Sequence, residues 1–190
     1  MKPADNALTT MRQDMHLDVR TLTQEAQSLT GNDPLRHYLR LGSDLHGNHL
    51  DWPELNVGWA LRGEVLQPAG GKPQHWLHLQ LRAQLPMTCQ RCLGQVMMPV
   101  EFDNSYRLVA DEATAELEDE QCDEDLLVLS KQFDLRALLE DELLLELPLM
   151  PKHEVCPTNV KLASTDDDFK AALTQKPNAF AVLGSLKKAP

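Results

Sequence analysis

Apolar and polar residues alternate through much of the segment between residues 57 and 109, and a period of two favours β-strands. In HWLHLQLRAQL, residues 75–85, the odd positions from Leu77 onward are apolar, so they are expected to face a core. VGWALRGEVLQ (residues 57–67) and QVMMPVEFDNSYRLV (residues 95–109) are two further strand candidates, and PAGGKPQ separates the first two strands with a turn-rich cluster. The sequence therefore predicts an antiparallel meander of at least three strands, either open or curled towards a barrel.

One long amphipathic helix is predicted after these strands, in FDLRALLEDELLLELP. Asp134 is a suitable N-cap, the following leucines supply a broad apolar face, and Pro148 ends the helix. Short N-terminal helices are predicted in TQEAQSL (residues 23–29) and in DPLRHYLRL (residues 33–41). The pattern as a whole indicates an α+β fold, with an antiparallel sheet, one long helix and short N-terminal helices.

Composition predicts one folded domain with extensions at both ends. Residues 1–15 are polar and are interpreted as a flexible arm, residues 16–160 as a single domain, and residues 161–190 as a mobile tail that ends in an apolar hook at 179–187. Residues 111–125 contain nine acidic residues and no Lys or Arg. Such a block repels itself, so a solvated loop is expected there.

No run in the sequence approaches the ~20 consecutive apolar residues of a membrane span. The start of the chain, MKPADNALTTMRQDM, also lacks the apolar core of a secretory signal. We therefore expect a cytoplasmic protein without a membrane partner, in which thiols stay reduced.

Four residues could form a metal site. Cys89 and Cys92 lie in CQRCLG, and His153 and Cys156 lie in HEVC, which gives the pattern C-x2-C-x60-H-x2-C. Thiolates and imidazoles are the ligands that Zn²⁺ prefers, and Gly94 suits a tight turn behind the first pair. Zinc would then join the tip of a hairpin to the loop after the long helix.

Two other interpretations of Cys89 and Cys92 stay open. A redox pair would need the C-x2-C at the start of a helix that follows a strand, whereas strand-like residues flank it here on both sides. The other interpretation is two reduced thiols in a tight turn. Cys122 lies in the acidic segment and is expected to be exposed and uninvolved.

The formal net charge of −11 bears on partners. Binding to nucleic acid is driven largely by Lys and Arg that neutralise phosphates, and the chain as a whole lacks that signature. Basic proteins are better suited on charge to an acidic chain. Any direct contact with RNA would need a local basic patch.

Three motifs together resemble the YceD family, whose members are named large ribosomal RNA subunit accumulation proteins. The motifs are CQRCLG, then DLRALLEDELLLELPLMPKH with a cysteine soon after, and finally KPNAFAVLGSLKK. The resemblance spans roughly residues 50–187. Some relatives carry a second cysteine pair after the helix, where this chain has His153 and Cys156.

The resemblance implies a role in the accumulation, processing or stability of 23S ribosomal RNA during large-subunit assembly, with no established enzymatic activity. We expect the partners to be 23S rRNA or its precursor, bound directly or indirectly, and a basic ribosomal protein or processing factor. The alternatives are a metal-dependent RNA-processing enzyme that uses Cys89 and Cys92, or an adaptor that uses the C-terminal hook. The candidate partner-binding residues are Arg91, Phe180, Val182, Leu183, Leu186, Lys187 and Lys188.

Overall fold

The computed structural model describes residues 15–48, 52–158, 164–166, 168–169 and 180. The chain divides into two units, Met1–Glu154 and Val155–Pro190. The helices and strands below all belong to the first unit. In the second unit, the backbone N–H of Phe169 donates a hydrogen bond to the carboxylate of Asp166, which forms a local turn.

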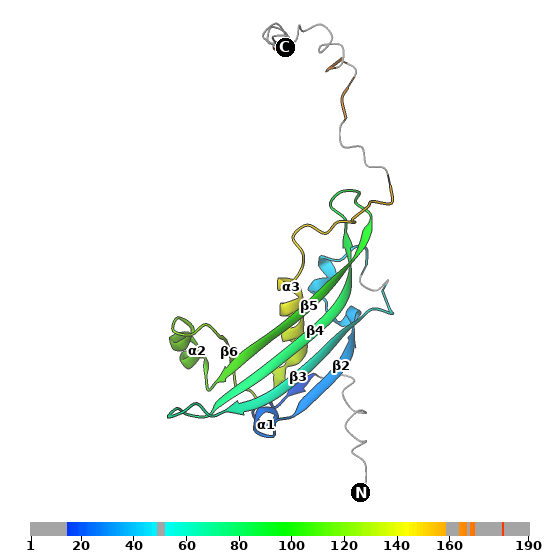
Figure 1. The fold of residues 1–190 in the computed structure, drawn as a ribbon. Coiled ribbons are helices and arrows are strands. Elements are labelled where there is room, and N and C mark those ends of the chain that lie inside the picture. Colours follow the sequence, from blue (N-terminus) through cyan, green and yellow to red (C-terminus); the bar gives the residue numbers. More distant parts are fainter. Residues whose placement is uncertain (1–14, 49–51, 159–163, 167, 170–179, 181–190) are drawn as a thin grey trace, which may run out of the picture. The chain divides into compact units, whose positions relative to one another are not determined.

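Five strands form one sheet in the order β2-β3-β4-β5-β6 (Figure 1). They are β2 (Ser28–Pro34), β3 (Asn56–Leu66), β4 (Gln74–Thr88), β5 (Gln95–Val109) and β6 (Asp125–Val128). Neighbours from β2 to β5 are antiparallel, which confirms the predicted meander, whereas β6 runs parallel to β5. The sheet is therefore mixed, and it is open because β2 and β6 each have one neighbour.

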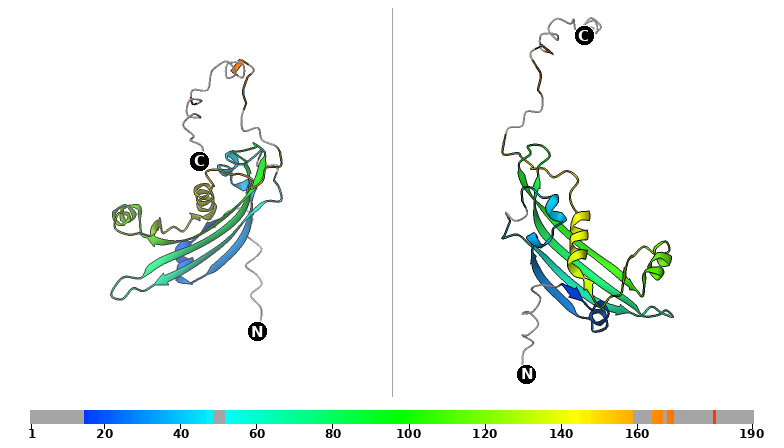
Figure 2. Two further views of the ribbon diagram at one scale, coloured as in Figure 1. Left: turned by 45° about the horizontal axis from the view of Figure 1, so that its top comes forward. Right: turned by 180° about the vertical axis from the view of Figure 1, so that it is seen from behind.

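The long helix α3 (Leu135–Leu145) lies along one face of this curved sheet (Figure 2). The Asp134 side chain accepts a hydrogen bond from the Ala137 N–H at 3.0 Å, so the predicted N-cap is confirmed. Leu139 and Leu143, one turn apart, are fully buried. The odd positions of β4 from Leu77 to Leu85 are buried as well, which is the alternation that the sequence predicts.

The remaining short elements pack around the sheet and α3. They are β1 (His16–Leu17), α1 (Val19–Gln24), the 3₁₀ turns η1 (Leu35–His37) and η2 (Leu41–Ser43), α2 (Glu112–Asp119) and β7 (Phe133–Asp134). The pair β1 and β7 forms a separate two-stranded sheet just before α3. Helix α1 packs on β3, where Gly63 leaves room for it: a Cβ atom at Gly63 would lie 2.7 Å from the Leu22 carbonyl oxygen.

Two carboxylates connect α3 to the N-terminal segments. Asp33, at the end of β2, accepts hydrogen bonds from Arg136 Nε at 2.9 Å and Nη2 at 3.3 Å. Glu140 is buried and accepts hydrogen bonds from the backbone N–H groups of Arg40 and Leu41 at 2.7 and 3.1 Å. These contacts satisfy two carboxylates that would otherwise be costly to bury.

The first of the two predicted N-terminal helices is wrong in its placement, whereas the 3₁₀ turn η1 lies inside the second predicted range, 33–41. Helix α1 lies over 19–24, ahead of the predicted 23–29, and is followed by Ala26 with a left-handed φ of 49°. Residues 28–34 are a strand that bonds to β3, because pairing with an existing sheet satisfies backbone groups that a short isolated helix leaves open.

The acidic segment 111–125 is not a loop throughout, which corrects the expectation from charge alone. Residues 112–119 form α2, and the Asp111 side chain accepts a hydrogen bond from the Thr114 N–H at 2.8 Å as its N-cap. An ion pair at 2.7 Å between Glu118 and Arg107 of β5 holds the helix. No residue of α2 is buried, so the segment is solvated as expected, but it is capped and anchored.

In the part of the chain that the structure describes, every helix is too short or too polar to cross a membrane.

Candidate metal centre

The C-x2-C pair lies in the tight connection between β4 and β5, here called the knuckle (residues 89–94). The Cys89 N–H donates to the Gly94 carbonyl at 2.8 Å, and the Leu93 N–H donates to the Cys89 carbonyl at 2.9 Å. The turn depends on Leu93, which adopts a left-handed φ of 60°. Gly94 is part of the tight turn as predicted, since its carbonyl accepts the hydrogen bond from Cys89, but its own φ is not positive.

The second half-site follows α3 and reaches the knuckle through the backbone. The Gln90 N–H donates a hydrogen bond to the carbonyl of Pro151 at 2.8 Å, and Pro151 is buried. Two residues further along the chain, His153 Nδ1 lies 3.4 Å from the Cys92 sulfur. Residues that are 61 positions apart in the sequence are thus neighbours.

The potential ligand atoms of Cys89, Cys92, His153 and Cys156 all lie within 4.8 Å of one another. In a tetrahedral zinc site with Zn–S of about 2.3 Å and Zn–N of about 2.0 Å, two sulfurs are ~3.8 Å apart and a sulfur and a nitrogen are ~3.5 Å apart. The 3.4 Å between Cys92 Sγ and His153 Nδ1 is close to this value. The group could therefore hold a metal ion, and its three thiols and one imidazole fit Zn²⁺ best.

The surroundings of Cys89 favour its thiolate. The residue is fully buried, and burial by itself would raise the pKa of the thiol. Hydrogen bonds to the sulfur from the backbone N–H groups of Cys92, His153 and Arg91, and from the His153 side chain, outweigh burial and lower the pKa to about 5. A thiolate held by N–H donors is ready to bind a metal, because the thiolate is the ligand.

The knuckle lies between two strands, and no helix begins at Cys92. The helical N-terminus that commonly activates a redox C-x2-C pair is therefore missing here. The group of four also contains no carboxylate, which a nuclease that uses Mg²⁺ would need.

Cys122 takes no part in this group within the described residues. Its sulfur lies 3.5 Å from the carbonyl oxygen of Glu124. The side chain is half-buried, where the sequence led us to expect exposure. Burial lowers the pKa of the neighbouring Arg107 guanidinium, but hydrogen bonds to Glu118 and, to a lesser extent, to Cys122 raise it above its ordinary value.

Of the candidate partner-binding residues, Arg91 and Phe180 are described, and both are exposed. Val182, Leu183, Leu186, Lys187 and Lys188 lie outside the described residues, so the proposed hook stays a prediction. Sequence reasoning missed Leu93, Met150 and Lys152, which are exposed at the knuckle or just after α3. The motif LPLMPKH did contain a signal, since apolar residues beside prolines at the end of a helix can mark an exposed connector.

The fold and this group define an α+β domain with a candidate thiolate–imidazole metal centre at one end of its sheet. The model of the family described as "Large ribosomal RNA subunit accumulation protein YceD" matches residues 77–187. This match covers more than half of the chain, which therefore belongs to the YceD family. It begins in β4 and contains all four potential metal ligands.

One relative is the large ribosomal RNA subunit accumulation protein YceD of Haemophilus influenzae, which is 30% identical over 112 residues. The alignment covers 57% of this chain and 63% of the relative, so it spans less than two thirds of the relative's length. No solved structure matches the chain.

Proposed function

We propose that this protein is a non-enzymatic ribosome-biogenesis factor that promotes the accumulation or processing of 23S rRNA during large-subunit assembly in the cytoplasm. The observation that carries this proposal is membership of a family described by large ribosomal RNA subunit accumulation. Its partners are then 23S rRNA or a precursor, with a basic ribosomal protein or processing factor suited to the acidic α2 segment.

The proposal includes a structural Zn²⁺ bound by Cys89, Cys92, His153 and Cys156. Four protein ligands fill a tetrahedral zinc ion and leave no position for a water molecule, which is typical of structural rather than catalytic sites. When bound, the ion cross-links the knuckle to the segment after α3. This chemistry supports a non-enzymatic role, since no open coordination site remains to activate water.

The test is the ratio of 23S to 16S rRNA in cells that lack this protein, complemented with the wild type, with Cys89→Ser/Cys92→Ser, or with Cys122→Ser as the matched control. We expect the ratio to fall on deletion and to be restored by the wild type and by Cys122→Ser only. A ratio that does not change on deletion would refute the role in 23S accumulation.

An RNA-processing enzyme makes a different prediction in vitro. Purified protein loaded with zinc would cleave a 23S precursor transcript, and a chelator would stop the cleavage. We expect no cleavage in either condition. Cleavage that depends on the metal would replace the non-enzymatic proposal with the enzymatic one.

A further inference from the structure

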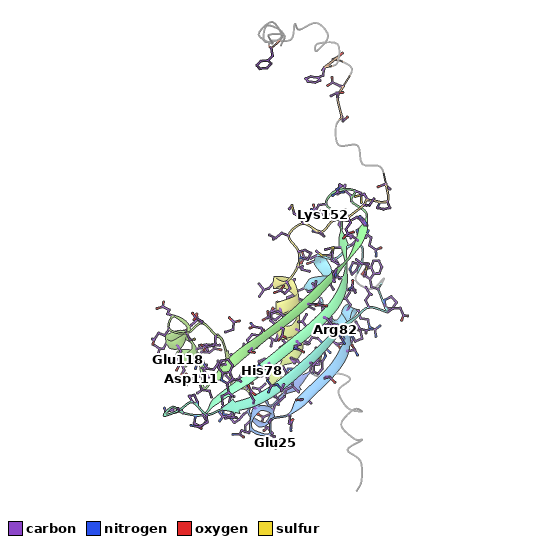
Figure 3. The ribbon with its side chains drawn as sticks, in the orientation of Figure 1. Glu25, His78, Arg82, Asp111, Glu118 and Lys152 are labelled. Atoms are coloured by element: carbon purple, nitrogen blue, oxygen red, sulfur yellow. The ribbon has the colours of Figure 1, made fainter. Side chains whose placement is uncertain are left out.

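The two ends of β5 differ in charge. Asp111 lies two residues after the C-terminal end of β5 and begins the acidic segment 111–125, which has nine carboxylates and no Lys or Arg. Figure 3 labels Asp111 and Glu118 at this end of the sheet and Lys152 at the other. The densest run of carboxylates in the sequence thus lies at the end of the sheet away from the knuckle.

The knuckle end lacks carboxylates along two stretches of chain. Residues 83–100 and 147–153 contain no Asp or Glu, and the flanking carboxylates on either side of the second stretch are Glu146 and Glu154. The same stretches contain Arg91 and Lys152, whose side chains are exposed. Exposed cations can contact an anionic partner, although the exposed carboxylates of Glu146 and Glu154 border the second stretch.

Apolar side chains are exposed beside these cations. Leu93 is 71% exposed, Met150 71% and Leu149 99%. The hydrogen bond from the Gln90 N–H to the Pro151 carbonyl joins the backbones of the two segments. Arg91 follows Gln90, and Met150 and Lys152 flank Pro151, so the three residues lie in the same region. We call the five side chains Arg91, Leu93, Leu149, Met150 and Lys152 the knuckle surface. Clustered apolar exposure of this kind marks interaction sites.

The net charge of −11 does not exclude an anionic partner at this end. The 15 residues of β5 separate Asp111 from the knuckle, and a strand of that length spans roughly 45–50 Å at about 3.3 Å per residue. The Debye length at physiological ionic strength is about 8 Å, so the carboxylates of α2 are screened at the knuckle surface. Local charge rather than net charge therefore decides what binds there.

We propose that the knuckle surface binds an unpaired, single-stranded segment of RNA. Arg91 and Lys152 contact phosphates, while Leu93, Leu149 and Met150 pack against the faces of exposed bases. Single-stranded segments expose bases that can pack in this way, whereas paired RNA hides them. The inference rests on the proposed function, because rRNA is the polyanion which that role brings to the protein.

The experiment measures fluorescence anisotropy of a labelled single-stranded RNA of about 20 nucleotides with mixed sequence, titrated with the full-length protein loaded with zinc. The test variant is Arg91→Glu/Lys152→Glu. The control is Arg82→Glu/Lys131→Glu, which changes the net charge by the same amount at exposed cations outside the knuckle surface. Zinc content and melting temperature of each variant establish that it is folded.

Two phosphate contacts to a single strand predict a slope of about −1.4 for log K against log salt. We expect this slope for the wild type, at least a tenfold loss of affinity with a slope near zero for the test variant, and less than a twofold change for the control. A double-stranded RNA of the same length is expected to bind at least tenfold more weakly than the single strand. Comparable affinity for the two would overturn the proposal.

Three further results would overturn the proposal: no binding by the wild type, equal loss in both variants, or poly-glutamate binding at the knuckle surface as tightly as RNA. The last would identify an acidic protein as the partner. The 23S to 16S ratio in cells separates this inference from the proposed function. An unchanged ratio after deletion refutes the role in 23S accumulation, whereas the anisotropy data decide only whether the knuckle surface binds RNA.

Discussion

The backbone N–H of Gln90 donates a hydrogen bond to the carbonyl of Pro151 at 2.8 Å, and neither residue offers a metal ligand. The two halves of the candidate metal centre are therefore joined by the backbone as well as by any ion. The sheet and α3 have their own buried leucine core. The domain is thus expected to keep its fold without the metal, while the knuckle end loses stability.

Removal of zinc with a chelator is predicted to lower the melting temperature by roughly 5–10 °C, which corresponds to ~2–3 kcal/mol in a protein of this size. Calorimetry with and without chelator measures the shift, and far-UV circular dichroism at 25 °C should stay unchanged. Loss of the β-sheet signal on chelation would contradict the independence of the sheet.

Cys92→Ser is predicted to abolish the binding of one equivalent of zinc, because the Cys92 sulfur is one of the four potential ligands and lies 3.4 Å from His153 Nδ1, and a hydroxyl is a poor ligand for Zn²⁺. Mass spectrometry of metal content after dialysis against a trace of zinc gives the stoichiometry. Cys122→Ser serves as the control and should retain the ion. Equal zinc content in all three proteins would show that the metal lies elsewhere.

Asp33→Ala is predicted to destabilise the domain by about 2–4 kcal/mol, because it leaves Arg136, which is partly buried, without its carboxylate. Urea unfolding measures the loss. Arg62→Ala breaks the pair with Glu64, in which the Arg62 side chain is half exposed, and should cost less than ~1 kcal/mol. If the two variants lost the same stability, the contact between β2 and α3 would be no more important than a surface pair.

Gly63→Ala is predicted to destabilise the domain by about 1–3 kcal/mol. A Cβ atom there would lie 2.8 Å from the Cα of Thr23 and 2.7 Å from the Leu22 carbonyl oxygen, so the backbone of α1 would have to move. Gly58→Ala, on the same strand, meets mainly the movable side chains of Asn32 and Arg82 and should be nearly neutral. Thermal melts of the two variants test this, and the opposite order would mean that α1 is not seated on β3.

Glu142 is predicted to make stability depend on pH. Burial raises the pKa of its carboxyl, and the charges of Asp125, Asp141 and Glu146 add to the rise, while the hydrogen bond from the Tyr106 hydroxyl opposes it. The folded state therefore binds this proton more tightly than the unfolded state. The stabilisation from protonation is complete below the ordinary pKa of about 4.5, and it is lost as the pH rises through the raised pKa.

Glu142→Gln keeps an acceptor for Tyr106 and removes this titration. We expect the variant to melt about 1–3 °C above the wild type at pH 7, with the difference disappearing below about pH 4.5. Glu146→Gln is the exposed control and should show a smaller difference. A variant that is less stable than the wild type at pH 7 would contradict the raised pKa.

Local sequence patterns correctly predicted the strands β4 and β5 and the long helix α3. Residues 95–109 are β5 as predicted, because alternation along the chain directly reflects the two faces of a strand. Asp134 caps α3 as predicted, since capping depends on residues within one turn. The four potential metal ligands were also found from spacing, and the structure brings them together.

Elements that depend on distant partners were not predicted. β2 is a strand because β3 offers an unpaired edge, and β6 is parallel to β5 because α2 reverses the chain between them. The left-handed turn at Leu93 was missed for a related reason. The free-energy cost of a left-handed φ at Leu93 is offset by hydrogen bonds within the knuckle, and the identity of the residue alone does not reveal those hydrogen bonds.

The sheet order also constrains how the protein can fold during synthesis. β2, β3, β4 and β5 are neighbours in the order in which they leave the ribosome, so each can pair with the one before it, and domains fold from the N-terminus as they emerge. The knuckle is complete after Gly94, but its second half-site arrives only with His153. A metal ion held by all four ligands would therefore be acquired late, and its binding would mark a chain whose sheet and long helix have already been made.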